Sequence, residues 1–308
     1  MRDRLNALYQ RLTKNVLGSE EPAYLLLVSL VADGHALIQG APGIGKTSLA
    51  ETLARSVDCR FKRVQFTPDL LPADLIGYSM FHQGRGEFEF VPGPVFSNVL
   101  LADEINRTSP RVQSALLECM NERQVSVDGV SHRLPPPYMV IATQNSLYSS
   151  GTFPLPEPQL DRFLIAVTMV LPDAATQSQI LALHASGGIL GADVDPLMHA
   201  DDVIVLQEAA RAVPVNEKVC DYITAICESA RRQRGMLQSI SARAAIALMR
   251  AAQAVAYMEG HNAVYPDDVK RIAGAVLGHR LGIGDGLGGS AMSPEAAIEE
   301  IFKITPVP

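Results

Sequence analysis

Residues 40–47 read GAPGIGKT and fit the pattern G-x-x-x-x-G-K-[ST] at every defined position. An apolar segment, HALIQ at 35–39, precedes the pattern and predicts a short strand. A helix is expected to begin at Lys46 and to run to about residue 57. A chance glycine-rich turn would not also supply the strand, the helix and the lysine. The sequence therefore predicts an α/β fold built on a phosphate-binding loop.

The residues of this loop are suited to holding a polyphosphate. Gly40, Gly43 and Gly45 allow backbone N–H groups to turn inward, and the N-terminus of the following helix adds its positive dipole end. Lys46 can reach the β- and γ-phosphates, and Thr47 can hold Mg²⁺. The predicted binding residues are Gly40, Ala41, Pro42, Gly43, Ile44, Gly45, Lys46, Thr47 and Ser48.

Two adjacent acids follow another apolar segment. Residues 98–102, NVLLA, predict a strand, and Asp103 and Glu104 come directly after it. Because parallel strands bring their carboxyl ends to one edge of a sheet, both carboxylates are expected beside the loop at 40–47. There Asp103 would help to hold Mg²⁺, and Glu104 would orient and deprotonate an attacking water. Taken alone, the pair would be read as surface acids at a helix start; the loop at 40–47 favours the site.

Three further polar residues are candidates for the same chemistry. Asn145 ends the segment MVIATQN, where a γ-phosphate and water would lie, and a turn asparagine is the alternative. Arg162 precedes another apolar segment. It either pairs with Asp161 or Glu157, or it reaches the γ-phosphate of a neighbouring subunit. Arg243 lies near a predicted helix start, where the helix dipole does not favour arginine, so a phosphate partner is a candidate.

The pattern of apolar residues divides the chain into two parts. Up to residue 172, helices alternate with apolar strand-like segments at 35–39, 62–66, 97–102, 138–143 and 163–170, as in a parallel sheet covered on both faces. Alternating segments at 87–93 and 123–134 predict two inserted hairpins, the second around the Asp128-Gly129 turn. From residue 173 onward only helical periodicity is found. An all-helical second domain is therefore predicted.

Composition narrows the possible functions. The net charge of −7 and the pI near 5.5 argue against a general nucleic-acid-binding face. The 4 cysteines include no C-x-x-C pair and no histidine partner at zinc spacing, so reduced thiols in a cytoplasmic protein are expected. The longest apolar run, residues 25–32, is shorter than the roughly 20 residues that cross a bilayer. No membrane span is expected.

Together these segments resemble the MoxR family of AAA+ ATPases over nearly the whole chain. The resemblance rests on GAPGIGKT, VIATQN, the closing ITPVP and two longer, more specific blocks, GPVFSNVLLADEINRTSPRVQSALLECMNERQVSVDG and GTFPLPEPQLDRFL. It implies an AAA+ P-loop αβα core at 1–172, with insertions near 74–93 and 123–134, and a helical lid at 173–308. It also implies ATP and Mg²⁺ as cofactors and a homo-oligomeric ring, usually a hexamer.

The resemblance further implies a role for each candidate: Walker A for Lys46 and Thr47, Walker B for Asp103 and Glu104, sensor 1 for Asn145, an arginine finger acting in trans for Arg162, and sensor 2 acting in cis for Arg243. Three positions depart from the family pattern. Ser146 stands where a proline is usual, Pro158 where an alanine is usual, and Ala242 where a helix breaker is usual. None of these departures removes a catalytic group.

The resemblance implies an ATPase that acts as a chaperone-like remodeller or maturation factor for a protein client, with a partner that carries a von Willebrand factor A domain. Three other classes are alternatives. A motor subunit of a metal-chelatase complex would depend on its partner for metal chemistry, because the sequence contains no metal-ligand cluster. A nucleic-acid motor is disfavoured by the acidic pI. A nucleotide-gated binding module that hydrolyses little is disfavoured by Glu104 and Arg162.

Overall fold

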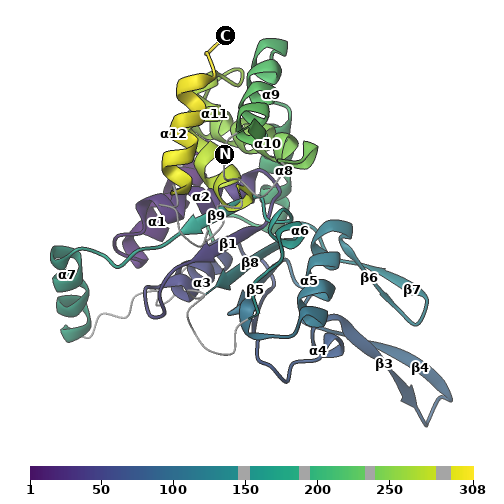
Figure 1. Cartoon of the computed structure of the whole chain (residues 1–308). Helices are drawn as coiled ribbons and strands as arrows, with labels where there is room; N and C mark the ends of the chain where they lie inside the picture. The colour runs from purple at the N-terminus through teal and green to yellow at the C-terminus, as the bar shows by residue number, and fades with distance from the viewer. Residues whose placement is uncertain (145–152, 187–194, 233–239, 282–292) are drawn as a thin grey trace, which may run out of the picture.

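The fold comes from a computed structural model, which describes residues 1–144, 153–186, 195–232, 240–281 and 293–308. The elements of the first part are α1 (Arg2–Asn15), α2 (Glu20–Val31), β1 (Ala36–Gln39), α3 (Lys46–Ser56), β2 (Phe61–Gln65), α4 (Pro72–Ile76), β3 (Gly77–His82), β4 (Glu87–Pro92), β5 (Val99–Asp103), η1 (Ile105–Arg107), α5 (Pro110–Glu122), β6 (Gln124–Val127), β7 (Val130–Arg133), β8 (Met139–Gln144), α6 (Glu157–Leu160) and β9 (Ile165–Thr168). The remaining elements are α7 (Ala174–Ala185), α8 (Ala200–Arg211), α9 (Glu217–Arg232), α10 (Ala242–Glu259), α11 (Pro266–Leu277), η2 (Gly278–Arg280) and α12 (Pro294–Ile304) (Figure 1).

Five strands form one parallel sheet in the order β2-β5-β8-β1-β9. Within the sheet, Ala36 of β1 lies opposite Ile141 of β8 on one side and Ile165 of the edge strand β9 on the other. Because all strand pairs are parallel, every carboxyl end lies at the same edge of the sheet. The predicted α/β core with a parallel sheet, followed by helices, is confirmed.

The two faces of the sheet pack into different cores. Ala36 and Ile38 of β1 pack with residues of α1, α2 and α3, whereas Leu37 packs with Val112 and Leu116 of α5. Successive side chains of a strand point to opposite faces, so a strand covered on both sides must be apolar at every position. This three-layer arrangement, visible in Figure 1, explains the continuous apolar segments of the central strands.

Two antiparallel hairpins project from the sheet (Figure 1). The first joins β3 to β4 and exposes the paired rings of Phe81 and Phe88, whose centroids are 5.2 Å apart. The second joins β6 to β7 through Asp128 and Gly129, which both have positive φ, at 50° and 79°. Positive φ at both positions is what the Asp-Gly pair is suited to provide in a tight turn.

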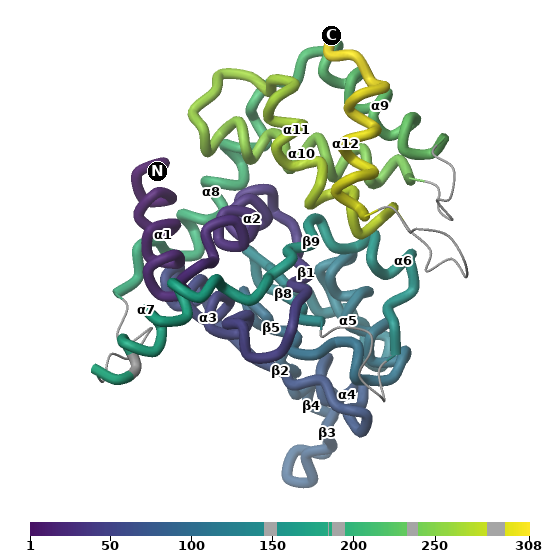
Figure 2. Tube along the Cα trace, turned by 60° about the vertical axis from the view of Figure 1, so that its left-hand side comes forward, coloured from purple at the N-terminus to yellow at the C-terminus, as the bar shows by residue number. Residues whose placement is uncertain are grey.

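The C-terminal helices do not form a core of their own. Residues of α8 to α12 belong to one apolar cluster with residues of α1, α2 and α3, and α2 contacts both α8 and α10. Figure 2 shows α2 running beside α8. The boundary at residue 172 therefore stays a prediction, since this cluster extends across it. Among the described residues, no helix is long and apolar enough to cross a membrane.

Three elements differ from what the sequence pattern predicts. α5 and β3 are not among the predicted elements, although α5 has apolar residues at helical spacing, Pro110 at its start and Arg123 in a left-handed conformation at its end. β2 is an edge strand with mostly exposed or half-buried residues, rather than an apolar strand covered on both faces. β9 is shorter than the apolar segment at 163–170, because only Ile165–Thr168 pair with β1.

Candidate active site

The loop at 40–45 connects the carboxyl end of β1 to the start of α3. Gly43 and Gly45 have φ of 80° and 90°, in the left-handed region that side chains disfavour, and Gly45 is the N-cap of α3. Ala41, Pro42 and Gly43 are exposed. The loop therefore leaves a helix N-terminus and its backbone N–H groups open to an anion.

Lys46 is buried at the base of this loop. Its Nζ donates to Gly40 O over 2.8 Å and to Gln144 O over 3.3 Å. Burial lowers the pKa of Lys46, and the nearby carboxylates of Asp103 and Glu104 act in the opposite direction. The ammonium is thus tied to both the loop and the end of β8, where it can meet a phosphate.

Asp103, at the end of β5, lies among polar groups from three elements. Its Oδ1 accepts the hydroxyl of Thr143 over 2.5 Å. Its Oδ2 accepts the hydroxyl of Thr47 over 3.4 Å and the guanidinium of Arg63 over 2.7 Å. The Thr47 hydroxyl and the Asp103 carboxylate are oxygen ligands of the kind that Mg²⁺ prefers, and Arg63 shows that this carboxylate already faces a cation. Thr47 and Asp103 therefore fit the predicted magnesium site.

Glu104 has a left-handed backbone, with φ of 59° and ψ of 49°. Its N–H donates to the hydroxyl oxygen of Thr143 over 2.9 Å. Its carboxylate accepts from Gln65 Nε2 and from Arg107 Nη1, each over 2.8 Å. A left-handed conformation is costly for a residue with a Cβ. Contacts with neighbours on β2 and η1, rather than the backbone preference of Glu104, therefore determine the direction of this carboxylate.

An apolar cavity of about 410 Å³ lies beside the loop. It is lined by Gly43, Ile44, Gly45 and Ser48 of the loop and helix start, and by Asn15, Val16, Leu17, Leu171, Pro172, Gln177, Ile180 and Leu181. The flat face of a nucleobase suits a cavity with this mainly apolar lining, and the loop would then hold the phosphates. α7 contributes three residues to this lining, Gln177, Ile180 and Leu181.

A second cavity, of about 240 Å³, lies at the opposite edge of the sheet. Gly34 and His35, just before β1, and Leu164, just before β9, line it. Its charged lining residues are Arg123, Arg162, Arg243, Arg250, Arg280, Asp33 and Asp161. Arginines thus dominate a cavity to which no residue of the loop at 40–48 contributes.

Two of these arginines are already paired. Arg280 contacts Asp161 over 2.8 Å, and Arg123 contacts Asp33 over 2.7 Å. Within the described ranges, Arg162, Arg243 and Arg250 have no carboxylate partner. The pairing of Arg162 with Asp161 or Glu157, one of the two expectations for this residue, is therefore not what the structure shows. Three guanidinium groups without a carboxylate partner around one cavity suit it to an anion.

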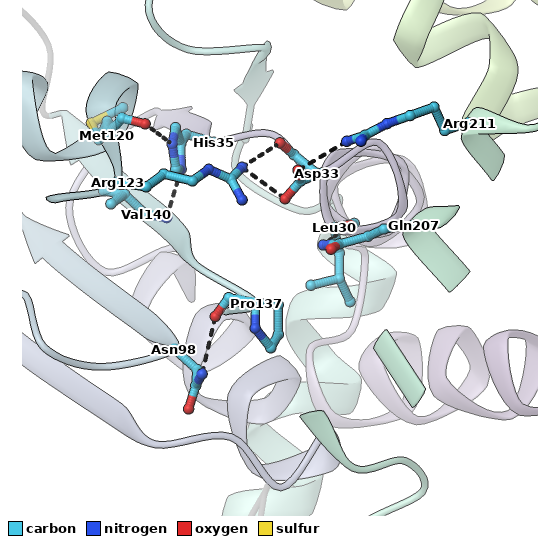
Figure 3. Close-up of polar contacts among 10 residues, drawn as sticks. All are labelled: Leu30, Asp33, His35, Asn98, Met120, Arg123, Pro137, Val140, Gln207 and Arg211. Carbon is cyan, nitrogen blue, oxygen red and sulfur yellow. Dashed lines mark hydrogen bonds and ion pairs between the residues drawn. The ribbon is translucent and has the colours of Figure 1, made fainter. Parts of the chain in front are cut away.

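Asp33 also joins this cavity to the helical part of the chain (Figure 3). Its carboxylate accepts from Arg123 and, over 3.2 Å, from Arg211 of α8. Beside it, Gln207 of α8 donates to Leu30 O over 3.0 Å. The cavity wall and α8 are thus linked by an ion-pair network.

Asn145 and Arg243 are the remaining predicted site residues. Asn145 lies outside the described residues. Arg243, expected as a sensor acting in cis, shares the second cavity with Arg162, whereas the loop at 40–48 lines the first cavity. The start of α10 thus lies beside residues that precede β1 and β9, on the amino side of the sheet, and the role of Arg243 as a sensor in cis stays a prediction.

Several residues of the site are not evident from the sequence alone. Thr143 and Arg63 hold Asp103, and Arg280 holds Asp161. Thr143 has one usable signal, since it is a polar residue in the otherwise apolar segment before Asn145. Arg63 likewise interrupts a predicted strand. Arg280 lies 118 residues from Arg162 along the chain, and no local pattern connects the two.

Comparisons with known proteins agree with this geometry. Residues 35–165 match the ATPase family associated with various cellular activities (AAA), and residues 230–301 match an AAA lid domain. The solved structure of a Cytophaga hutchinsonii protein, provisionally described as an ATPase, superposes with a TM-score of 0.90 at 35% identity, covering 100% of this chain and 96% of that one.

Similar sequences extend over the same length. An uncharacterized protein of Bacillus subtilis, YeaC, is 40% identical, covering 97% of this chain and 93% of its own length. Chaperone MoxR1 of Mycobacterium tuberculosis is 37% identical, covering 95% of this chain and 79% of its own. Protein MoxR of Paracoccus denitrificans is 32% identical, covering 95% and 93%. With its phosphate-binding loop, its parallel sheet and its helical lid, the chain belongs to the MoxR family of AAA+ ATPases.

Proposed function

We propose that this chain hydrolyses ATP to ADP and phosphate, with Mg²⁺, as a subunit of a homo-oligomeric ring that remodels a protein client. The observation that best supports this proposal is that the residues of the loop and acidic pair lie apart from Arg162 within one chain. Lys46, Asp103 and Glu104 lie at the carboxyl ends of the strands, whereas Arg162 lies before the amino end of β9. The two groups therefore lie at opposite ends of the strands, and a single strand such as β1, with 4 residues, spans roughly 13 Å. Arg162 therefore serves the nucleotide of a neighbouring copy.

Within one subunit, the roles follow from the contacts. Lys46 is placed for the β- and γ-phosphates, and the base enters the apolar cavity beside the loop. Thr47 and Asp103 would hold Mg²⁺, which neutralises phosphate charge when bound. Glu104 orients an attacking water and accepts its proton. To do so, its carboxylate must exchange its contacts with Gln65 and Arg107 for a contact with that water.

At the subunit interface, the three unpaired arginines of the second cavity would meet the γ-phosphate of the neighbouring subunit. Arg162 acts there as the arginine finger, and Arg243 adds a second guanidinium beside it. A phosphate group, with its several acceptor oxygens, matches such a cluster of planar donors. Nucleotide hydrolysis would then depend on two chains, which accounts for a ring as the active form.

We also propose a protein client, a partner protein and a location in the cell. The name of the relative Chaperone MoxR1 supports action on a protein client. A partner with a von Willebrand factor A domain and a hexameric ring are expected from the family resemblance. The 4 free cysteines support a cytoplasmic location. The exposed hairpin β3–β4, with Tyr78, Phe81 and Phe88, is a candidate client-contacting surface.

The test mixes two inactive variants. Arg162→Ala keeps its own loop but lacks the finger, and Lys46→Ala keeps the finger but lacks the phosphate contact. Each variant alone is expected to lose at least about a hundredfold in hydrolysis. In a randomly mixed ring, about one interface in four combines an intact loop with an intact finger, so activity should return. The control is each variant mixed with itself.

Two outcomes would contradict the proposal. One is the absence of recovery in rings that native mass spectrometry shows to be mixed. The other is full activity of a monomer. For the client, Glu104→Gln held in Mg²⁺-ATP should capture a protein that Lys46→Ala does not. Capture of chelatase subunits, or stimulation of hydrolysis by DNA, would replace the remodelling role with that of a chelatase motor or a nucleic-acid motor.

A further inference from the structure

The backbone around Arg162 is held by one buried side chain from the lid. All five N–H groups of the Arg280 guanidinium are used. Nε donates to Asp161 Oδ1 over 2.8 Å, and Nη2 donates to Asp161 O over 3.2 Å and to Phe163 O over 2.6 Å. Nη1 donates to Leu164 O over 3.2 Å and to Val276 O. The chain immediately before and after Arg162 is therefore fixed.

Only the side-chain torsions of Arg162 are left to be set. The side chain is long and half-buried, and it borders a cavity that contains the like charges of Arg243 and Arg250. Repulsion from these charges would push the guanidinium toward solvent unless another group holds it.

Asn121 is the group in contact with it. The terminal amide of Asn121 has two orientations related by a half-turn, and in only one of them are both partners satisfied. In that orientation the amide oxygen accepts from Arg162 Nε and from Nη1, each over 3.2 Å. In the described part of the chain, Nη2 of Arg162 has no hydrogen-bond partner, so N–H groups remain for a phosphate.

The position of Asn121 suits this purpose. It lies in the last turn of α5, which is anchored in the core by Leu116 and Leu117. The Asn121 side chain itself is exposed and adds nothing to that packing. An amide is neutral, so it can orient a guanidinium without cancelling its charge, as an aspartate would.

We propose that Asn121 is a positioning residue for the arginine finger: it holds the Arg162 guanidinium in the orientation that presents its free N–H groups to the phosphate of the neighbouring subunit. This inference rests on the proposed function of Arg162. It assigns a role in the reaction to a residue outside the loop, the acidic pair and the arginines.

The test compares ATP hydrolysis by Asn121→Ala, Arg162→Ala and the double variant, measured as release of radiolabelled phosphate so that residual rates are quantified. Asn121→Ala is expected to lower kcat about tenfold, because the two hydrogen bonds to Arg162 Nε and Nη1 are lost, with KM for ATP changed less than about threefold. The double variant should be no slower than Arg162→Ala, because Asn121 acts through Arg162. Glu122→Ala, in the same exposed turn, is the matched control and should retain wild-type kcat.

The outcomes separate this inference from the function on which it rests. If Arg162→Ala is impaired and Asn121→Ala is not, the role of Asn121 is wrong while the finger stands. If Asn121→Ala slows the Arg162→Ala background by the same factor as wild type, Asn121 acts independently and the inference is wrong. Wild-type activity of Arg162→Ala would overturn both. Thermal unfolding of Asn121→Ala should match wild type, since the side chain is exposed.

Discussion

Thr143 on β8 donates its hydroxyl hydrogen to Asp103 Oδ1, at the end of the neighbouring strand β5, over 2.5 Å. The same hydroxyl oxygen accepts the N–H of Glu104 over 2.9 Å. The hydroxyl is fully buried and has both a donor and an acceptor partner, so its position is determined. One side chain on β8 thus aligns both acids of the proposed active site.

The Thr143→Val variant tests the alignment of the two acids, because it removes the hydrogen bonds of the hydroxyl but keeps the packing of the side chain. Valine keeps the shape of threonine but leaves the Asp103 carboxylate and the Glu104 N–H without this partner. We expect kcat for ATP hydrolysis to fall roughly tenfold or more, and stability to fall by about 1–3 kcal/mol. Thr143→Ser, which keeps the hydroxyl, is the control. Equal activity of Thr143→Val and wild type would show that the alignment has no role in hydrolysis.

The stability of the fold should depend on the protonation of His35. His35 Nδ1 accepts the Val140 N–H over 3.0 Å, and its Nε2 lies 3.0 Å from Met120 O, so the neutral ring satisfies both contacts (Figure 3). A second proton would place an N–H against an N–H donor. Burial is the main cause that lowers the pKa of His35 from 6.5 to about 4.

Between pH 6.5 and 4 the unfolded chain therefore binds more protons at this residue than the folded chain, and stability falls as the pH falls. Over this window we expect wild type to lose about 3 kcal/mol more than His35→Gln, which can supply one donor and one acceptor. Urea unfolding across the pH range measures the difference. His82→Gln, an exposed histidine of the first hairpin, is the control. Parallel pH profiles of wild type and His35→Gln would contradict the assignment.

Arg280 should contribute more to the free energy of unfolding than a single surface charge does, because it is buried and makes several hydrogen bonds. Its side chain is only 5% exposed, and replacement by methionine leaves the Asp161 carboxylate and several carbonyl groups without partners. We expect a loss of about 3–5 kcal/mol in the free energy of unfolding. The matched control is Arg271→Met, since Arg271 pairs with Glu21 over 2.6 Å at the surface and should lose about 1 kcal/mol. Similar losses in the two variants would refute the distinction.

Asp33 should stabilise the folded state through its charge rather than through its backbone conformation. Its φ of 58° is left-handed, which asparagine also tolerates, so Asp33→Asn removes the charge shared by Arg123 and Arg211 and keeps the turn. We expect a loss of about 1–3 kcal/mol. In this background, Arg211→Ala should add little. Asp58→Asn is the control, because Asp58 also has a positive φ but pairs with His199 at an exposed position. Additive losses from Asp33→Asn and Arg211→Ala would argue against the network.

The parts of the site that are contiguous in sequence were predictable. Gly40 to Thr47 form a loop between a strand and a helix because their spacing and residue types allow little else. Asp103 and Glu104 follow an apolar strand, and the shared direction of parallel strands brings them to the same edge. The helix α5 was predictable too, because Val112, Leu116 and Met120 recur at helical spacing. β2 departs from the expected apolar strand because it lies at the edge of the sheet.

Contacts between distant segments depended on the tertiary structure. The order β2-β5-β8-β1-β9 places Thr143 against Asp103 and Arg63 near the end of β5, although their separations in sequence are 40 residues each. The packing of α10 and η2 against the start of β9 places Arg243 and Arg280 with Arg162. The sequence by itself determined the phosphate loop and the acidic pair, because local backbone geometry and strand direction suffice for them. The arginine cavity and its supporting contacts were decided only by how the strands and the lid pack, because no local rule specifies which distant side chains meet.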